Sequence, residues 1–225
     1  GCADVSGSML WEGKEPNRPI DIAIGLTLFM SEIASEQFRD LAMSFTTEPR
    51  IMNFSGKTLE EKMNIMNQYV GYSTNYEGMH RALIDMCIKK TVKEEDIPII
   101  VVYTDGDFNQ MDPNVAGKWD TIHKGIMTMW VTAGYSKVPT IVYWNLNSQS
   151  LGVQTSSNQK GVMFLQGRSA TNIKYILYGE CAEESVTVVD GQKVKVSSVT
   201  PYEIFRKAME GNHFLDLEKI LHRSN

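Results

Sequence analysis

The sequence contains no long apolar run and no excess of positive charge. No stretch approaches the roughly eighteen consecutive apolar residues that a membrane-spanning helix needs, and the first residues do not resemble a signal sequence. The 22 lysines and arginines are scattered among 27 acidic residues, which gives a net charge of −5. Broad binding to a phosphate backbone requires clustered positive charge. We therefore expect that this domain binds neither a membrane nor nucleic acid directly.

Cysteine is scarce as well. The three cysteines, Cys2, Cys87 and Cys181, are an odd number at distant positions, and two of them lie within apolar runs. This arrangement fits buried reduced thiols better than a disulfide framework, so we expect an intracellular, cytoplasmic protein. The four histidines have neither HExxH nor paired spacing, and the pattern therefore favours core or surface roles over zinc ligation.

Signatures of catalysis and of calcium hands are incomplete. Ser8 lacks the glycine that a G-x-S-x-G elbow requires two residues later, because Leu10 stands there. Residues 105–109 begin like an EF-hand loop, but Gln110 replaces its glycine and Ala116 replaces its terminal glutamate. No pair of nucleophile and base stands out. We expect a domain that is not an enzyme.

Length and hydrophobic content suit one domain with a sizeable core. The 225 residues are 42% hydrophobic, and apolar segments with helical period alternate with short apolar runs typical of buried strands. A turn with Pro49 joins two of these runs as a hairpin. The pattern predicts an α/β fold with a doubly wound, mostly parallel six-stranded sheet, helices on both faces and one antiparallel edge strand. Helices are expected at 20–35, 58–69, from the loop after Thr74 to about 90, 119–133 and 170–178, and strands at 41–45, 50–54, 99–104, 139–145 and 161–166, beside a first strand ending at Asp4.

The carboxy-terminal part differs from this alternation. Valines at every second position on both sides of Asp190-Gly191 predict a β-hairpin over 185–199, followed by a helix at 201–210 and a short tail. We expect one domain, residues 1–225, with a core at 1–178 and a hairpin and helical extension at 184–225. The few residues before Asp4 and the missing initiator Met favour a carboxy-terminal fragment of a longer protein.

The run Asp4-Val5-Ser6-Gly7-Ser8 places one carboxylate and two hydroxyls on alternate residues. Side chains two apart in an extended or tightly looped segment point the same way, so these oxygens are expected to converge. Ligands of oxygen alone favour magnesium, calcium or manganese. The run by itself is equally consistent with a turn, because Asp and Ser also hydrogen-bond their own backbone.

Two later segments support the metal site. Residues 71–75, with Thr74, open a stretch of helical period, and the apolar run 99–104 ends in Asp105. Both segments place an oxygen ligand in a loop beside a strand end. In open α/β sheets, ligands bind beyond the carboxyl ends of the strands.

The order Asp-x-Ser-x-Ser, a Thr that opens a helix and an Asp that closes a buried strand resembles the von Willebrand factor A domain and its metal-ion-dependent adhesion site, over roughly residues 1–177. The resemblance implies that Asp4, Ser6, Ser8, Thr74 and Asp105 are the ligands, some directly and some through water. It also implies a protein partner whose Asp or Glu completes the coordination. Mg²⁺ is the expected ion, with Ca²⁺ or Mn²⁺ as alternatives.

Four residues beside these ligands are expected to form a partner-binding rim: Tyr72, Asn75, Asp107 and Asn109. The chain departs from the A-domain pattern at Tyr72 and Ser73, where small residues, commonly glycine, often precede the Thr. A bulky Tyr72 would either narrow the open coordination position or supply a contact to the partner.

Further stretches resemble an uncharacterised family of large proteins of plants, fungi and large DNA viruses, which join a carboxy-terminal A-like domain to an upstream half similar to Ro (TROVE) proteins. The stretches are 19–26, 140–146, 158–162 and 167–169. This likeness leaves a second reading open, in which the domain is the scaffold part of an RNA–protein assembly whose upstream half binds RNA. Two more alternatives are an ion that only ties loops together and a metal-dependent phosphohydrolase with Asp107 as base.

Overall fold

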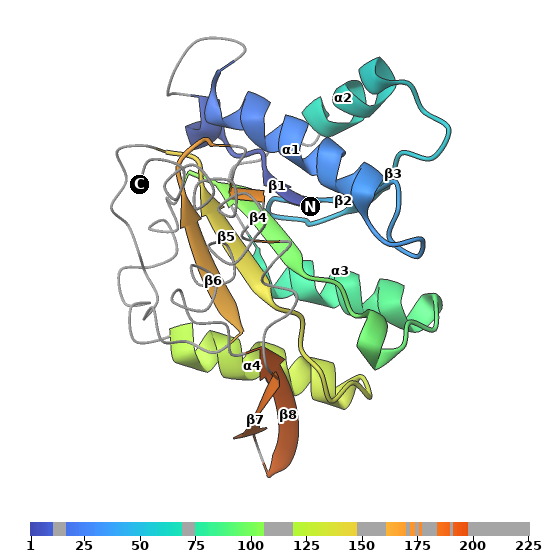
Figure 1. The fold of residues 1–225 in the computed structure, drawn as a ribbon, viewed down its shortest axis with the longest axis vertical. Coiled ribbons are helices and arrows are strands. Elements are labelled where there is room, and N and C mark those ends of the chain that lie inside the picture. The colour runs from blue at the N-terminus through green and yellow to red at the C-terminus, as the bar shows by residue number, and fades with distance from the viewer. Residues whose placement is uncertain are drawn as a thin grey trace, which may run out of the picture.

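The computed structural model describes residues 1–10, 17–68, 75–105, 119–147, 161–169, 172–173, 176, 184–189 and 191–197. These residues form a six-stranded sheet with helices on both faces and a separate two-stranded hairpin (Figure 1). The elements are β1 (Cys2–Asp4), α1 (Pro19–Ile33), β2 (Leu41–Phe45), β3 (Ile51–Asn53), α2 (Leu59–Asn67), α3 (Tyr76–Lys89), β4 (Ile100–Thr104), α4 (Trp119–Thr132), β5 (Ile141–Asn145), β6 (Val162–Gln166), β7 (Glu184–Val189) and β8 (Gln192–Ser197), with short 3-10 turns η1 (Gly7–Leu10) and η2 (Glu94–Asp96).

The strand order confirms the predicted architecture. The sheet runs β3-β2-β1-β4-β5-β6, and every neighbouring pair is parallel except the edge pair β2–β3. This is the order of a doubly wound α/β fold, in which the crossovers run outward in both directions from β1. The short central strand β1 pairs with β2 on one side and with β4 on the other.

Each face of the sheet carries its own apolar core, because successive strand residues point to opposite faces. Cys2 and Val102 pack with α3 and α4 on one face, where Trp130 is fully buried. Ala3 and Tyr103 pack with α1 and α2 on the other face. The prediction of helices on both faces is therefore confirmed (Figure 1).

Local signals set the helix starts. Thr58 caps α2: its hydroxyl accepts from the Glu61 amide, and its own amide donates to the Glu61 carboxylate, so the two residues form a capping box. Pro19 is the first residue of α1, and the helix ends at Ile33 rather than at the expected residue 35, because Ala34 is already extended. Of the predicted helix 170–178, the described residues 172, 173 and 176 are helical.

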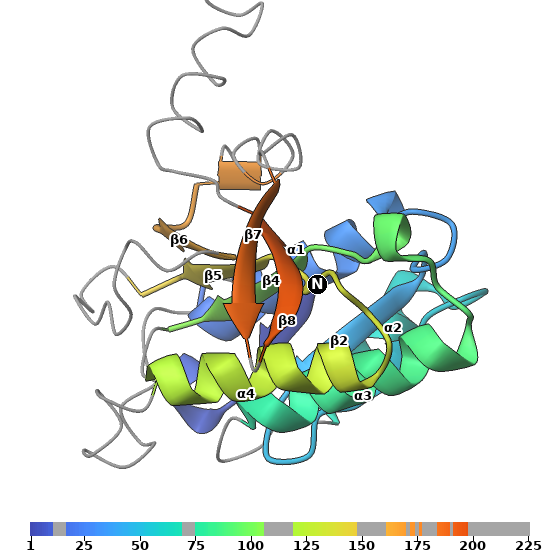
Figure 2. The same ribbon diagram turned by 90° about the horizontal axis from the view of Figure 1, so that it is seen from below.

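The predicted carboxy-terminal hairpin is confirmed as β7 and β8, an antiparallel pair that lies beside α4 (Figure 2). Val194 is buried in the core against which α4 packs, whereas Val186 and Val188 are 56% and 64% exposed on the other strand. The Lys195 amide donates to the Ser136 carbonyl, which joins β8 to the loop after α4. The helix expected at 201–210 and the tail to 225 lie outside the described residues, as does Cys181.

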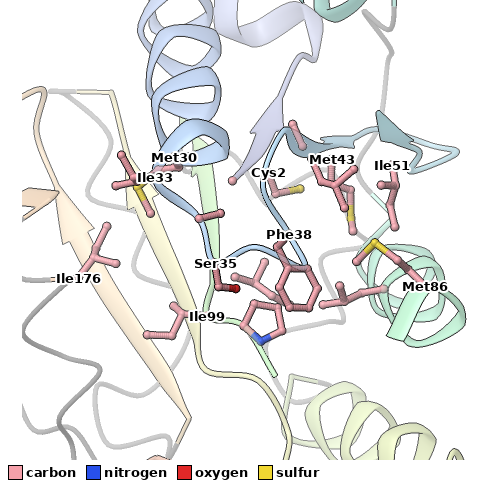
Figure 3. Close-up of a pocket in the computed structure, with 17 residues that line it drawn as sticks. Cys2, Met30, Ile33, Ser35, Phe38, Met43, Ile51, Met86, Ile99 and Ile176 are labelled. Atoms are coloured by element: carbon pink, nitrogen blue, oxygen red, sulfur yellow. The ribbon is translucent and has the colours of Figure 1, made fainter. Parts of the chain in front are cut away.

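An apolar cavity of about 210 Å³ lies at the amino ends of β1, β2 and β4. Side chains from α1, the α1–β2 connection and the start of the sheet point into it, among them Met30, Phe38 and Cys2 (Figure 3). Among the described residues that line it, none has a charged side chain. The cavity is at the end of the strands opposite to Asp4 and Thr104, and none of the described expected ligands, Asp4, Ser6, Ser8 and Asp105, lines it. Among the described helices, none has both the length and the apolar character that crossing a membrane requires.

Candidate metal centre

The carboxyl ends of β1, β2 and β4 meet at one edge of the sheet, because these strands are parallel neighbours. Asp4 is the last residue of β1, and Thr104 is the last residue of β4. Asp105 follows directly and is buried. β1 lies beside β4 in the sheet (Figure 1), and this topology brings Asp4 to the same edge as Asp105.

Both oxygens of the Asp4 carboxylate accept hydrogen bonds from the protein. The Ser6 amide donates to Oδ1 at 2.9 Å, which closes a turn after the strand. The Thr104 hydroxyl donates to Oδ2 at 3.0 Å from the neighbouring strand. Asp4 is 3% exposed, so these bonds hold a carboxylate that water barely reaches.

The two serine hydroxyls gather beside Asp4. The Oγ atoms of Ser6 and Ser8 are 3.0 Å apart, and Ser8 lies in η1, the turn that follows β1. The Met9 amide donates to the Ser6 carbonyl, and the side chains of Val5 and Met9 are fully buried in the core under α1. The turn therefore has a polar side and an apolar side, as the alternation of polar and apolar residues in the sequence predicts.

Electrostatics at this edge disfavour a lone negative charge. Burial raises the pKa of Asp4 to about 6, and the nearby charge of Asp105 acts in the same direction. The hydrogen bonds from Ser6 and Thr104 lower the pKa but do not cancel the effect of burial. A cation next to a buried pair of carboxylates favours their charged forms, so this environment fits a bound metal ion.

The donor set fits a hard divalent cation. It combines carboxylate and hydroxyl oxygens, which suit Mg²⁺ with part of its water shell retained. In the described ranges, no group of three or more His, Cys, Asp or Glu side chains is placed to hold a metal ion. The expected site has a different composition, with two carboxylates and several hydroxyls. Its ligands would therefore neutralise less of the ion's charge than three or more acidic side chains would.

The structure covers only part of the expected site. It brings together Asp4, Ser6 and Ser8, and it places Asp105 at the same edge. The remaining predicted ligand, Thr74, and the rim residues Tyr72, Asp107 and Asn109 lie outside the described residues.

Asn75, the described member of the predicted rim, connects α3 to the sheet. Its amide donates to the Thr46 carbonyl at 3.1 Å, and its side-chain amide donates to the Thr47 carbonyl at 3.2 Å, both just beyond β2. Its Oδ1 accepts from the Gly78 amide at 2.8 Å and so caps α3. These bonds fix the amino end of α3 at the edge where Asp4 lies.

Thr104 is the residue at this edge that the sequence analysis did not single out. It ends an apolar run, and in the sequence it looks like one more β-branched strand residue. Its hydroxyl is buried and faces Asp4. The signal that could have found it is a hydroxyl directly before the acidic residue at a buried strand end.

Comparisons with known proteins place the chain in a family. The family model described as "Domain of unknown function (DUF7788)" matches residues 1–209. "Uncharacterized protein L728" of Acanthamoeba polyphaga mimivirus is 31% identical over 180 residues, which are 79% of this chain; the chain spans about 30% of the length of that relative. The solved structure of the Deinococcus radiodurans RO (RSR) protein is similar with a TM-score of 0.46 and 17% identity, covering 75% of this chain and 31% of that chain. By its match over residues 1–209, the chain belongs to the DUF7788 family.

Proposed function

We propose that this chain is a metal-dependent protein-interaction domain that binds an acidic side chain of a partner through a divalent cation at the carboxyl edge of the sheet. Asp4, Ser6, Ser8, Thr74 and Asp105 would hold the ion. Mg²⁺ is the first choice, with Ca²⁺ or Mn²⁺ as alternatives. The partner is a protein that offers an Asp or Glu.

One observation carries the proposal: a buried carboxylate, two clustered hydroxyls and a second buried acidic residue share one edge. Asp4 is hydrogen-bonded on both oxygens, the Ser6 and Ser8 hydroxyls lie 3.0 Å apart, and the charge of Asp105 acts on Asp4. Burial and the nearby charge of Asp105 both raise the pKa of Asp4, and a cation at this edge would favour the charged carboxylate. A cation site accounts for this group of carboxylates and hydroxyls better than a purely structural role does.

The balance of ligands favours binding over catalysis. Hydroxyls leave more positive charge on the ion than carboxylates would, and when bound the ion supplies a coordination position that takes an acidic oxygen from outside. The turn after β1 would place the Ser6 and Ser8 hydroxyls at this edge, and Asp4 and Asp105 would supply the negative charge. Hydrolysis would also need a general base beside the ion, and the candidate for that role, Asp107, lies outside the described residues.

Removing the two hydroxyls tests the metal site. Ser6→Ala with Ser8→Ala should abolish the rise in melting temperature that Mg²⁺ produces, with little change in fold by circular dichroism. In the unchanged protein, a hundredfold excess of Mg²⁺ over its Kd would stabilise by about 2.7 kcal/mol. Ser55→Ala, an exposed serine beyond β3, is the matched control and should keep the full response. An undiminished Mg²⁺ response in the double variant would refute the ligand assignment.

Partner binding requires a separate experiment with the intact protein. Capture of a protein partner should require Mg²⁺, should be lost with a chelator and should be lost in the Ser6→Ala, Ser8→Ala variant. Capture that is unaffected by chelator, beside an intact Mg²⁺ response, would indicate an ion that only ties loops together. Binding of RNA by the intact protein but not by this chain, weakening with salt, would support the RNA–protein assembly instead.

A further inference from the structure

We propose that Thr104 is a positioning residue for the candidate metal centre, fixing the carboxylate of Asp4 from the neighbouring strand. This inference rests on the proposed function, since it assigns a role toward the ion of that site. Thr104 does not join the ligand set. It acts through Asp4.

The geometry is a buried hydroxyl aimed at one carboxylate oxygen. Thr104 Oγ1 donates to Asp4 Oδ2 at 3.0 Å, and the two side chains are 1% and 3% exposed. Since the register pairs Ala3 with Tyr103, the next residues along the two strands are Asp4 and Thr104, which lie side by side. The Thr104 carbonyl accepts from the Leu146 amide at 2.7 Å, so the backbone beneath the hydroxyl is fixed as well.

The bond limits how Asp4 can face an ion. Oδ1 of the Asp4 carboxylate accepts from the Ser6 amide, and Oδ2 accepts from the Thr104 hydroxyl. Together these bonds fix the direction in which the carboxylate faces. Partners that hold metal-binding side chains in place commonly change metal affinity by about 10- to 100-fold when they are removed.

A hydroxyl deletion tests the inference directly. Thr104→Val keeps the shape of the side chain and removes the donor, whereas Thr104→Ser keeps the donor and removes a methyl group. We expect Mg²⁺ titration calorimetry to show about 10- to 100-fold weaker binding for Thr104→Val, and binding within a few-fold of the unchanged protein for Thr104→Ser. A purely structural Thr104 would lower the melting temperature of the metal-free protein without changing the Mg²⁺ affinity.

The outcomes separate this inference from the proposed function. Unchanged Mg²⁺ affinity in Thr104→Val, together with loss of binding in Ser6→Ala, Ser8→Ala, overturns the role of Thr104 and leaves the metal site standing. If the unchanged protein binds no Mg²⁺, Ca²⁺ or Mn²⁺, both ideas fall. If Thr104→Val does not fold, Thr104→Ser and Thr104→Cys, which are similar in size, are compared instead. We then expect weaker Mg²⁺ binding for Thr104→Cys, because a thiol is a poorer hydrogen-bond donor than a hydroxyl.

Discussion

At the scale of single residues, burial and charge are in conflict at Asp4. The proposed metal site would require its charged carboxylate, yet burial raises the pKa of Asp4 to about 6. A carboxyl whose folded pKa is raised stabilises the fold only when protonated, so its charged form costs stability at neutral pH. A bound cation would instead favour the charged carboxylate and so stabilise the folded protein at neutral pH.

Asp4→Asn should therefore stabilise the metal-free protein and remove its response to Mg²⁺. The amide keeps an acceptor for the Ser6 N–H and carries no charge, so we expect a gain of about 1–3 kcal/mol at pH 8 in the presence of chelator. Chemical unfolding with and without Mg²⁺ measures both effects. A destabilised Asp4→Asn protein, or one that still responds to Mg²⁺, would contradict this account.

The sequence pattern predicted Asp4, Ser6, Ser8 and Asp105 at this edge, but it did not predict the role of Thr104. The alternation of Asp4, Ser6 and Ser8 was sufficient to expect their convergence, because it depends on local backbone geometry. The bond from Thr104 to Asp4 spans a hundred residues. It exists because β4 lies next to β1, and a sequence without the sheet order does not say which strand ends are neighbours.

At the scale of elements, the amino end of α3 depends on one close contact. A Cβ on Gly78 would lie 2.8 Å from Asn75 Nδ2 and 3.0 Å from Oδ1, the atom that caps the helix. A side chain at position 78 would therefore push the capping group out of place. Gly25 is exposed in the middle of α1, and a Cβ on it would meet no described atom within 4 Å beyond its chain neighbours and the helix's own backbone.

Two glycine-to-alanine changes should consequently differ. Gly25→Ala should raise the free energy of unfolding by about 0.8–1 kcal/mol, the ordinary difference in helix propensity. Gly78→Ala should gain nothing or lose stability, because losing the Asn75 cap costs about 1 kcal/mol and offsets that gain. Urea unfolding of the two variants measures the difference. Equal gains would show that the cap is not disturbed.

Elements were predictable in kind and order, and less so in their bounds. The apolar runs at 41–45 and 50–54 became β2 and β3 with the predicted antiparallel pairing. The strand expected at 99–104 begins at Ile100, where pairing with Ile141 begins. Boundaries of this kind follow from tertiary hydrogen bonds, whereas helix and strand type follow from the local period of apolar residues.

At the scale of the whole molecule, the two helices on one face are joined through a buried histidine. His80 of α3 accepts a hydrogen bond on Nδ1 from Trp130 of α4 at 3.1 Å. Burial lowers its pKa to about 3, and the neighbouring His123 adds to the effect. Tyr76 covers its ring edge-on at 5.0 Å between centroids. His80 is thus held neutral in the folded protein.

This histidine should contribute to acid unfolding. Its contribution is complete above the unfolded pKa of about 6.5 and is lost as pH falls toward the folded pKa, because only the unfolded state takes up the proton, at up to about 1.4 kcal/mol per pH unit. His80→Asn, which keeps an acceptor near Nδ1, should show a shallower loss of stability between pH 6.5 and 4. Parallel pH profiles for the two proteins would exclude this role.

The central position of β1 bears on the thermodynamics of ion binding. This strand is held by ladders on both sides, and it carries Asp4 to the edge already bonded to Ser6 and Thr104. Such preorganisation means that the strands contribute no ordering penalty when an ion arrives. If the proposed ion binds at this edge, dehydration of the cation would govern its affinity, and a small, tightly hydrated ion would exchange more slowly here than a larger one.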